Sequence, residues 1–151
     1  MNKIKVIVPF YNPGEFLDNC ISTVMTQKYD DYKIIFIDDV STDGSYDKLP
    51  QDNENVIIIK NEIRKTALEN IHDAIMNYCE KDDIVVLLDG DDWFPNKKVL
   101  KYVDEQYQQH DCWIMYGQAS WTDGRRGFAS AYPPEEFENV RTANFRVSHL
   151  R

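Results

Sequence analysis

Cysteine, glycine and proline are scarce in this sequence, with three, six and six residues among 151. Cys20, Cys79 and Cys112 lie in apolar contexts and lack the spacing of metal ligands, so we expect reduced thiols in a cytoplasmic protein rather than disulfides. The sequence also lacks internal repeats, low-complexity segments and linkers. A single domain over residues 1–151 is therefore expected.

Long apolar runs and basic side chains are scarce as well. No stretch approaches the roughly 20 apolar residues of a membrane span, and the apolar run at the N-terminus is too short for a signal peptide. The 26 acidic residues outnumber the 17 basic ones, which gives a formal net charge of -9. This charge disfavours nucleic acid and anionic membranes as partners, because the long-range electrostatic interaction is repulsive.

Two kinds of apolar pattern alternate along the chain. Short runs of mostly β-branched residues predict strands at 4–9, 33–37, 56–59, 84–88 and 112–116. Apolar residues at helical spacing predict helices over 16–25, 66–79 and 99–107. This alternation predicts an α/β fold with a doubly wound, mostly parallel sheet and helices on both faces.

Two helix starts carry capping patterns. Asn12, Pro13 and Glu15 combine an Asn cap, a proline at the first helical position and an acid three residues after the cap, so a helix should follow at once. Thr66 and Glu69 have the spacing of a capping box before the second helix.

The stretch Ile84–Trp93 joins an apolar strand to three carboxylates, Asp89, Asp91 and Asp92. Ligands of open parallel sheets bind just beyond the carboxyl ends of the strands. Crowded carboxylates are hard oxygen ligands that suit Mg2+ or Mn2+, usually with substrate phosphates completing the coordination shell. The alternative is a tight Asp-Gly turn in which the acids only cap a helix.

Two further strands deliver candidate binding residues to the same edge. The first should bring Phe10 and Tyr11 there, and the Tyr11 ring could stack on a nucleobase. The second ends at Asp38 and Asp39, either of which could accept a hydrogen bond from a nucleobase or cap the next helix.

Basic residues occur at two places that could face a phosphate. Arg64 and Lys65 precede a helix N-terminus, where free amide groups would complete a phosphate site; solvated loop cations are the alternative. The segment 139–151 has no acid, so it either faces a diphosphate or an acidic acceptor, or it forms a surface tail. Its cationic or titratable residues are Arg141, Arg146, His149 and Arg151.

Three segments together resemble a known family: Val6–Asn12, Ile37–Ser45 and Leu88–Trp93. In this order and at these distances they resemble the N-terminal part of family 2 glycosyltransferases, over nearly the whole chain. Members of that family are inverting enzymes of the Rossmann-like GT-A fold that use sugar nucleotides. The chain departs from the family at Val40, where the common motif has glycine after the paired aspartates.

The resemblance implies roles for several strand-end residues. Pro9, Tyr11 and Asp39 would hold the uracil and ribose. Asp91 and Asp92 would belong to the Asp-X-Asp element that meets the ribose and the metal. A glycine and an arginine that the family has near residues 61–70 are not clearly matched. Arg64 is the candidate for the corresponding phosphate ligand. With the strand-end residues above, the candidate nucleotide site comprises Pro9, Phe10, Tyr11, Asp38, Asp39, Arg64, Asp89 and Asp91.

Family members continue into an acceptor-binding half that carries the catalytic aspartate. We therefore expect a nucleotide-binding core at 1–117 and the start of the acceptor side at 118–151, with the fold truncated there. The catalytic base is then expected outside the chain, and His149 is the alternative base, because histidine is the side-chain type that can change charge near neutral pH.

The resemblance implies a glycosyltransferase that uses Mn2+ or Mg2+ and transfers a sugar with inversion. The donor would be a UDP-sugar and the acceptor a hydroxyl of a saccharide or protein. One alternative is a sugar-nucleotide-binding module without competent transfer. A nucleotidyltransferase is a third hypothesis, weakened because the sequence has no basic glycine-rich loop for a triphosphate.

Overall fold

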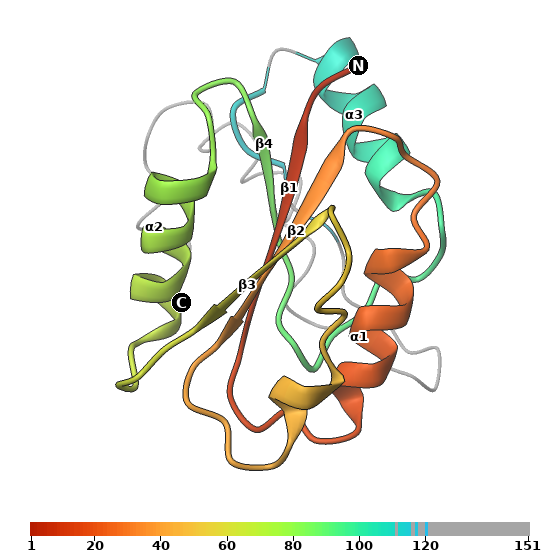
Figure 1. Cartoon of the computed structure of the whole chain (residues 1–151). Coiled ribbons are helices and arrows are strands. Elements are labelled where there is room, and N and C mark those ends of the chain that lie inside the picture. The colour runs from red at the N-terminus through yellow and green to blue at the C-terminus, as the bar shows by residue number, and fades with distance from the viewer. Residues whose placement is uncertain (111, 116, 118–119, 121–151) are drawn as a thin grey trace, which may run out of the picture. The chain divides into compact units, whose positions relative to one another are not determined.

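Within the residues that the structure describes, four parallel strands form a sheet (Figure 1). The computed structural model describes residues 1–110, 112–115, 117 and 120. The strands are β1 (Ile4–Phe10), β2 (Tyr32–Asp38), β3 (Val56–Lys60) and β4 (Ile84–Leu87). Their spatial order is β3-β2-β1-β4, which confirms the α/β fold with a parallel sheet.

The strand order reverses direction at β1. The chain moves outward from β1 through β2 to β3, and then returns to place β4 on the other side of β1. Phe10 at the end of β1 pairs with Asp38 at the end of β2, and Ile7 pairs with Leu87 at the end of β4. The carboxyl ends of β1 and β4 therefore flank a topological switch point, the usual place for a ligand in such a sheet.

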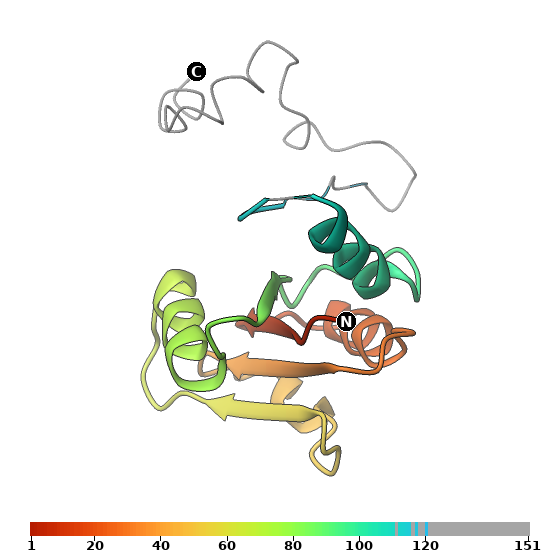
Figure 2. The same ribbon diagram turned by 90° about the horizontal axis from the view of Figure 1, so that it is seen from above.

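Helices cover both faces of the sheet, as predicted (Figure 2). The helix α2 (Ala67–Tyr78) lies on one face, while α1 (Phe16–Met25) and α3 (Val99–Gln109) lie on the other. On the α2 face, Ile7, Ile35 and Ile37 form a buried cluster with Ala74 of the helix. Alternate strand residues point to opposite faces of a sheet, and both sets are buried here. This burial on two faces explains why β1 and β2 read as continuous apolar runs.

The predicted cap of the first helix is wrong, although the helix itself covers the predicted residues 16–25. Asn12 has a left-handed backbone with φ 48°, and α1 begins only at Phe16 with Glu15 at the cap position. The Asn12 side chain is instead engaged across the sheet edge, where its Oδ1 accepts from the Thr42 amide at 2.8 Å. The capping box of α2 is confirmed, because the Thr66 and Glu69 side chains each accept from the other residue's backbone amide.

After β2 the chain forms a short 3-10 helix, η1 (Ser45–Lys48), in a segment for which no helix was predicted. The strand predicted at 112–116 is wrong over 112–115, and residue 116 lies outside the described residues. Five apolar residues carry too little periodicity to identify a strand, which forms only where a pairing partner exists. The predictions for Arg141, Arg146, His149 and Arg151 also concern residues outside those described.

The three cysteines are free thiols, as predicted. Cys20 is buried, and Cys79 and Cys112 are partly buried. In the part of the chain that the structure describes, no helix combines the length and apolar character needed to cross a bilayer.

Candidate functional site

A cleft of about 600 Å³ opens at the carboxyl edge of the sheet. It draws its lining from the loops after β1, β2, β3 and β4 and from the first turns of α2. The lining residues are Pro9, Phe10, Tyr11, Asn12, Pro13, Phe16, Asp39, Arg64, Lys65, Thr66, Ala67, Asn70, Asp89, Gly90 and Asp91. The structure thus brings together seven of the eight predicted nucleotide-site residues; Asp38 is not among them.

Tyr11 supplies the aromatic surface of the cleft. It is the first residue after β1 and is 46% exposed, which is high for a large aromatic side chain. The Arg64 guanidinium lies over its ring, with Cζ 3.4 Å from the ring centroid. The ring is therefore held in place and presents a stacking surface to the cleft.

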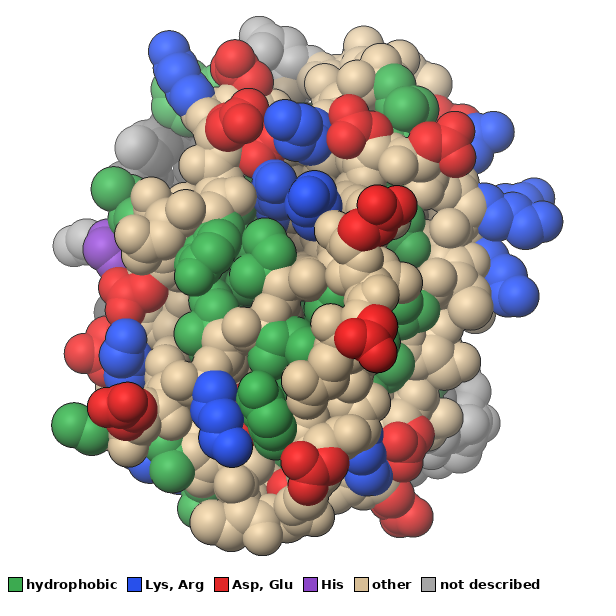
Figure 3. Space-filling view, viewed as in Figure 1, with side chains coloured by type: hydrophobic (Ala, Val, Ile, Leu, Met, Phe, Trp, Pro, Cys, Tyr) green, Lys and Arg blue, Asp and Glu red, His purple; other side chains and the backbone are tan. Residues whose placement is uncertain are grey.

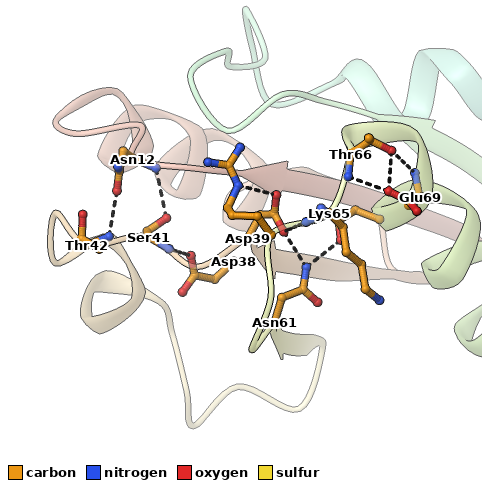
Figure 4. Close-up of polar contacts among 11 residues, drawn as sticks. Asn12, Asp38, Asp39, Ser41, Thr42, Asn61, Lys65, Thr66 and Glu69 are labelled. Atoms are coloured by element: carbon orange, nitrogen blue, oxygen red, sulfur yellow. Dashed lines mark hydrogen bonds and ion pairs between the residues drawn. The ribbon is translucent and has the colours of Figure 1, made fainter.

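Asp39 lies at the centre of a hydrogen-bond network (Figure 4). Its Oδ1 accepts from Asn61 Nδ2 and from the Lys65 amide, both at 2.8 Å, and its Oδ2 accepts from Arg64 Nε at 3.0 Å. Burial acts to raise the pKa of this carboxyl, but the hydrogen bonds outweigh it and hold the pKa below its ordinary value. Asp39 is therefore a charged, acceptor-only group at neutral pH.

Asparagines extend this network, and sequence reasoning missed them. Asn61 follows β3 directly, and its Nδ2 also donates to Asn70 Oδ1 at 2.7 Å. Asn70 is only 3% exposed and lines the cleft from α2. The position of Asn61 at the end of a strand was the available signal, because every strand end of this sheet faces the same edge.

Asp38 occupies a different position from its neighbour. It is fully buried, and its Oδ1 accepts from the Ser41 amide at 2.8 Å, which closes the turn after β2. Its Oδ2 has no hydrogen-bond partner among the described residues. Asp38 therefore stabilises the turn after β2, which is neither the predicted contact with a nucleobase nor the predicted helix cap.

Asn12 and the loop after β2 are clamped to each other, as Figure 4 shows. The Asn12 amide donates to Ser41 Oγ at 3.0 Å, and Asn12 Oδ1 accepts from the Thr42 amide. The clamp spans two residues with left-handed backbone, Asn12 and Val40, the latter with φ 66°. Such a conformation is costly for a β-branched residue and is typical of functional sites. The clamp thus fixes the loops that carry Tyr11 and Asp39.

The residues 89–92 after β4, called the acidic turn below, continue the pairing of β4 with β1. The Leu88 amide donates to Ile7 O at 3.1 Å and the Gly90 amide to Pro9 O at 3.2 Å, so the turn lies directly against the end of β1. The Asp92 amide closes it by donating to Asp89 O at 3.0 Å. This arrangement places Asp89 and Asp91 in the cleft lining, while Asp92 lies outside it.

The electrostatics of the turn are unfavourable without a cation. Partial burial of the carboxyl raises the pKa of Asp92, and the like charges of Asp91 and Asp89 raise it further. Burial raises the pKa of the nearby Cys20 thiol, and the charges of the same three carboxylates raise it further, to about 12. A cation bound at the turn would relieve this repulsion.

The donor set suits a hard cation that keeps other ligands. Among the described residues, no group of three or more His, Cys, Asp or Glu side chains is arranged to hold a metal by itself. Mg2+ in particular is commonly held by one or two carboxylates together with substrate phosphates. Asp91 and Asp92 could supply such a pair of carboxylates.

The fold and the cleft together define the class of the domain. A parallel sheet of order 3-2-1-4, with a cleft at its switch point lined by an aromatic residue and carboxylates, is an α/β domain of the kind that binds ligands at this edge. The sequence model of Glycosyl transferase family 2 matches residues 5–149. The chain therefore belongs to this family.

Three known proteins illustrate the similarity. The poly(ribitol-phosphate) beta-glucosyltransferase of Bacillus spizizenii is 30% identical over 132 residues, which cover 82% of this chain and 20% of that protein. Structures of S. aureus TarS 1-349 give a TM-score of 0.71 at 20% identity, covering 90% of this chain and 40% of that one, and 0.61 at 23% identity for its UDP-GlcNAc complex, covering 72% and 32%. The mannosyltransferase PcManGT of Pyrobaculum calidifontis, in complex with GDP-Man and Mn2+, gives 0.62 at 19% identity, covering 91% and 38%. The chain thus spans two fifths or less of the length of each.

Proposed function

We propose that this chain binds the nucleotide-sugar donor of a metal-dependent, inverting glycosyl transfer, with a UDP-sugar as the donor. The observation that carries the proposal is the cleft at the switch point, where Tyr11, Asp39 and the acidic turn meet. Each supplies a different part of donor recognition. The acceptor is proposed to be a hydroxyl of a saccharide or protein.

The nucleobase of the donor is assigned to the end of the cleft formed by Tyr11 and Asp39. The exposed Tyr11 ring offers a stacking surface. The Asp39 carboxylate only accepts hydrogen bonds, and uracil presents an imino N–H that can donate to it. A site built around such a pair discriminates between bases, because a base without a suitably placed N–H cannot bond to the carboxylate.

The diphosphate is assigned to the acidic turn through a divalent cation. Asp91 and Asp92 would hold Mn2+ or Mg2+, which when bound neutralises the diphosphate leaving group. Complexes of relatives support both parts of this assignment: TarS is known with UDP-GlcNAc, and PcManGT with GDP-Man and Mn2+. Residues 1–117 form the proposed nucleotide-binding part, and residues 118–151 the start of the acceptor side.

The test is UDP binding with and without metal. A thermal-shift screen of UDP, GDP and TDP sugars identifies the nucleotide, and calorimetry then compares UDP affinity in Mn2+ with that in EDTA. We expect Mn2+ to tighten UDP binding by about tenfold or more, since a difference of only ~1.4 kcal/mol produces that factor. Equal affinity in Mn2+ and EDTA would contradict the proposal.

Asp92→Asn separates a binding role from a structural one. The variant should lose the metal-dependent gain in UDP affinity but keep its melting temperature, because removing one of three like charges relieves repulsion. Asp82→Asn is the matched control: Asp82 is an exposed residue of the loop before β4 and is not part of the acidic turn that follows that strand. A large loss of stability in Asp92→Asn alone would indicate that the acidic turn is structural.

A further inference from the structure

Arg64 lies on both groups that the proposed base site offers. Its guanidinium stacks on the Tyr11 ring, and its Nε donates to Asp39 Oδ2 at 3.0 Å. The three residues come from the loops after β3, β1 and β2, respectively, and all three line the cleft. Arg64 therefore joins the two recognition groups within the cleft itself.

The contacts of Arg64 are those expected of a bound pyrimidine. A guanidinium is planar and delocalised, stacks on aromatic rings, and donates N–H bonds in its own plane. A uracil that stacks on Tyr11 and donates its imino N–H to Asp39 uses the same kind of surface and the same acceptor. A base that makes both contacts on this side of the ring must take the position of the guanidinium.

The bonding of Asp39 leaves only one of its oxygens for a ligand. Oδ1 already accepts two hydrogen bonds, from Asn61 Nδ2 and the Lys65 amide. Oδ2 accepts one, from Arg64 Nε. The oxygen that retains an acceptor site for a ligand is therefore the one that Arg64 already contacts.

Burial shows which partner can move. The Asp39 side chain is 6% exposed, whereas the Arg64 side chain is 52% exposed. Asp39 is also fixed by the Asn61 and Lys65 bonds, which do not depend on Arg64. Arg64 can thus leave without disturbing the carboxylate that a base would bind.

We propose that Arg64 is an internal occupant of the nucleobase position, which the base of the donor must displace. The inference rests on the proposed function and specifies how the same cleft is controlled. The apparent affinity for the base is then lowered by the fraction of molecules in which Arg64 is docked. Docked Arg64 also keeps the buried Asp39 charge paired in the ligand-free protein.

The test uses uridine, which carries the base but no phosphate. Calorimetric titration of the 151-residue chain is compared with Arg64→Ala, and UDP with Mn2+ is titrated into both. Arg64→Ala should bind uridine about tenfold more tightly, since a partly exposed ion pair and a cation–π contact are together worth about that factor. Arg64→Lys should fall between them, because an ammonium keeps the ion pair but not the planar stacking.

Lys60→Ala is the matched control. Lys60 Nζ lies 4.0 Å from the ring centroid of Tyr46, so this pair is a second cation over a tyrosine, and neither residue lines the cleft. Its removal should leave uridine affinity unchanged. Proton NMR gives an independent reading: the Arg64 side-chain signals, shifted by the Tyr11 ring, should return to the values of a free arginine when uridine is added to the wild-type chain.

The outcomes separate the two proposals. Uridine affinity that is unchanged or weaker in Arg64→Ala overturns the inference, because Arg64 then does not compete for the site. Arg64 signals that stay shifted at saturating uridine also overturn it, while UDP binding in Mn2+ leaves the proposed function standing. If the wild-type chain binds neither UDP nor uridine, the proposed function is overturned and, with it, the inference.

Discussion

At the scale of single residues, Gly90 determines the geometry of the acidic turn. A Cβ at this position would overlap Phe10 Cβ, because the turn lies against the end of β1. Glycine is needed here for a close approach between two backbone segments rather than for a special φ. The carboxylates on either side of Gly90 owe their position in the cleft to this contact.

Gly90→Ala should therefore damage both stability and binding. Overpacking of this kind costs about 1–3 kcal/mol, and relief of the clash requires the turn to move away from β1. Chemical denaturation measures the first effect and UDP titration in Mn2+ the second. Gly44→Ala is the control: Gly44 has φ 83° but no atom within 4 Å of an added Cβ, so that variant should be strained without losing UDP affinity. Equal UDP affinity in both variants would contradict this account.

Single residues also show where prediction from sequence ended. Tyr11, Asp39 and Asp91 could be placed at one edge because each follows a strand, and parallel strands end at the same edge. The stacking of Arg64 on Tyr11 could not be predicted, since it depends on the path of the loop after β3. The left-handed Val40 was equally invisible, because intrinsic preference argues against it and only the Asn12 clamp to Ser41 and Thr42 explains it.

At the scale of elements, the strands and helices within residues 1–110 were predictable because burial of one or both faces of an element sets the spacing of its apolar residues. The alternation of buried strands and one-sided helices appears directly in the sequence. Element ends were less predictable: Asn12 has the composition of a helix cap but is held by tertiary hydrogen bonds. Contacts between distant elements, such as those of α3 with the chain start, leave no local pattern at all.

A single carboxylate ties α3 to the start of the chain. Asp104 Oδ1 accepts from the Asn2 amide at 3.0 Å and from Asn2 Nδ2 at 2.8 Å, and its Oδ2 accepts from Gln108 Nε2 at 2.8 Å. Burial acts to raise the pKa of Asp104, but these bonds outweigh it and lower the pKa. The charged form of Asp104 is therefore bound more favourably in the folded than in the unfolded chain.

Asp104→Ala should cost about 1–3 kcal/mol at pH 7, because it leaves partly buried donors unpaired. A carboxyl whose pKa is lowered by folding stabilises the protein at pH values above its pKa in the unfolded chain, which is about 4. That stability is lost as the pH falls from there through the folded pKa, so the difference between wild type and variant should shrink below pH of about 4. Urea unfolding at a series of pH values measures this.

Glu105→Ala provides the comparison on the same helix. Glu105 is an exposed partner of Lys101 at 3.9 Å, and such pairs contribute about 0–1 kcal/mol. A pH-independent cost of Asp104→Ala would show that packing, rather than the charged hydrogen bonds, is responsible.

At the scale of the whole molecule, the net charge of -9 opposes an anionic ligand. On the face shown in Figure 3, acidic and basic side chains are interspersed around a central group of apolar side chains, so that face has no single-sign region. The cleft lining contains three carboxylates, of Asp39, Asp89 and Asp91, and two cationic side chains, of Arg64 and Lys65. The proposed diphosphate is thus repelled both by the molecule as a whole and by the acidic turn unless a cation is present.

Salt should therefore strengthen UDP binding in the absence of metal. Between about 0.01 and 0.1 M salt the Debye length shortens from about 30 to about 10 Å, which screens the long-range repulsion. We expect roughly two- to threefold tighter UDP binding in EDTA over that range, on the basis of the same screening. Uridine, which is uncharged, should bind equally at both salt concentrations and serves as the control. The measurement is calorimetry in EDTA. UDP affinity that falls with added salt would mean that Arg64 and Lys65 dominate the electrostatic potential at the cleft, which would contradict a cleft that repels the diphosphate.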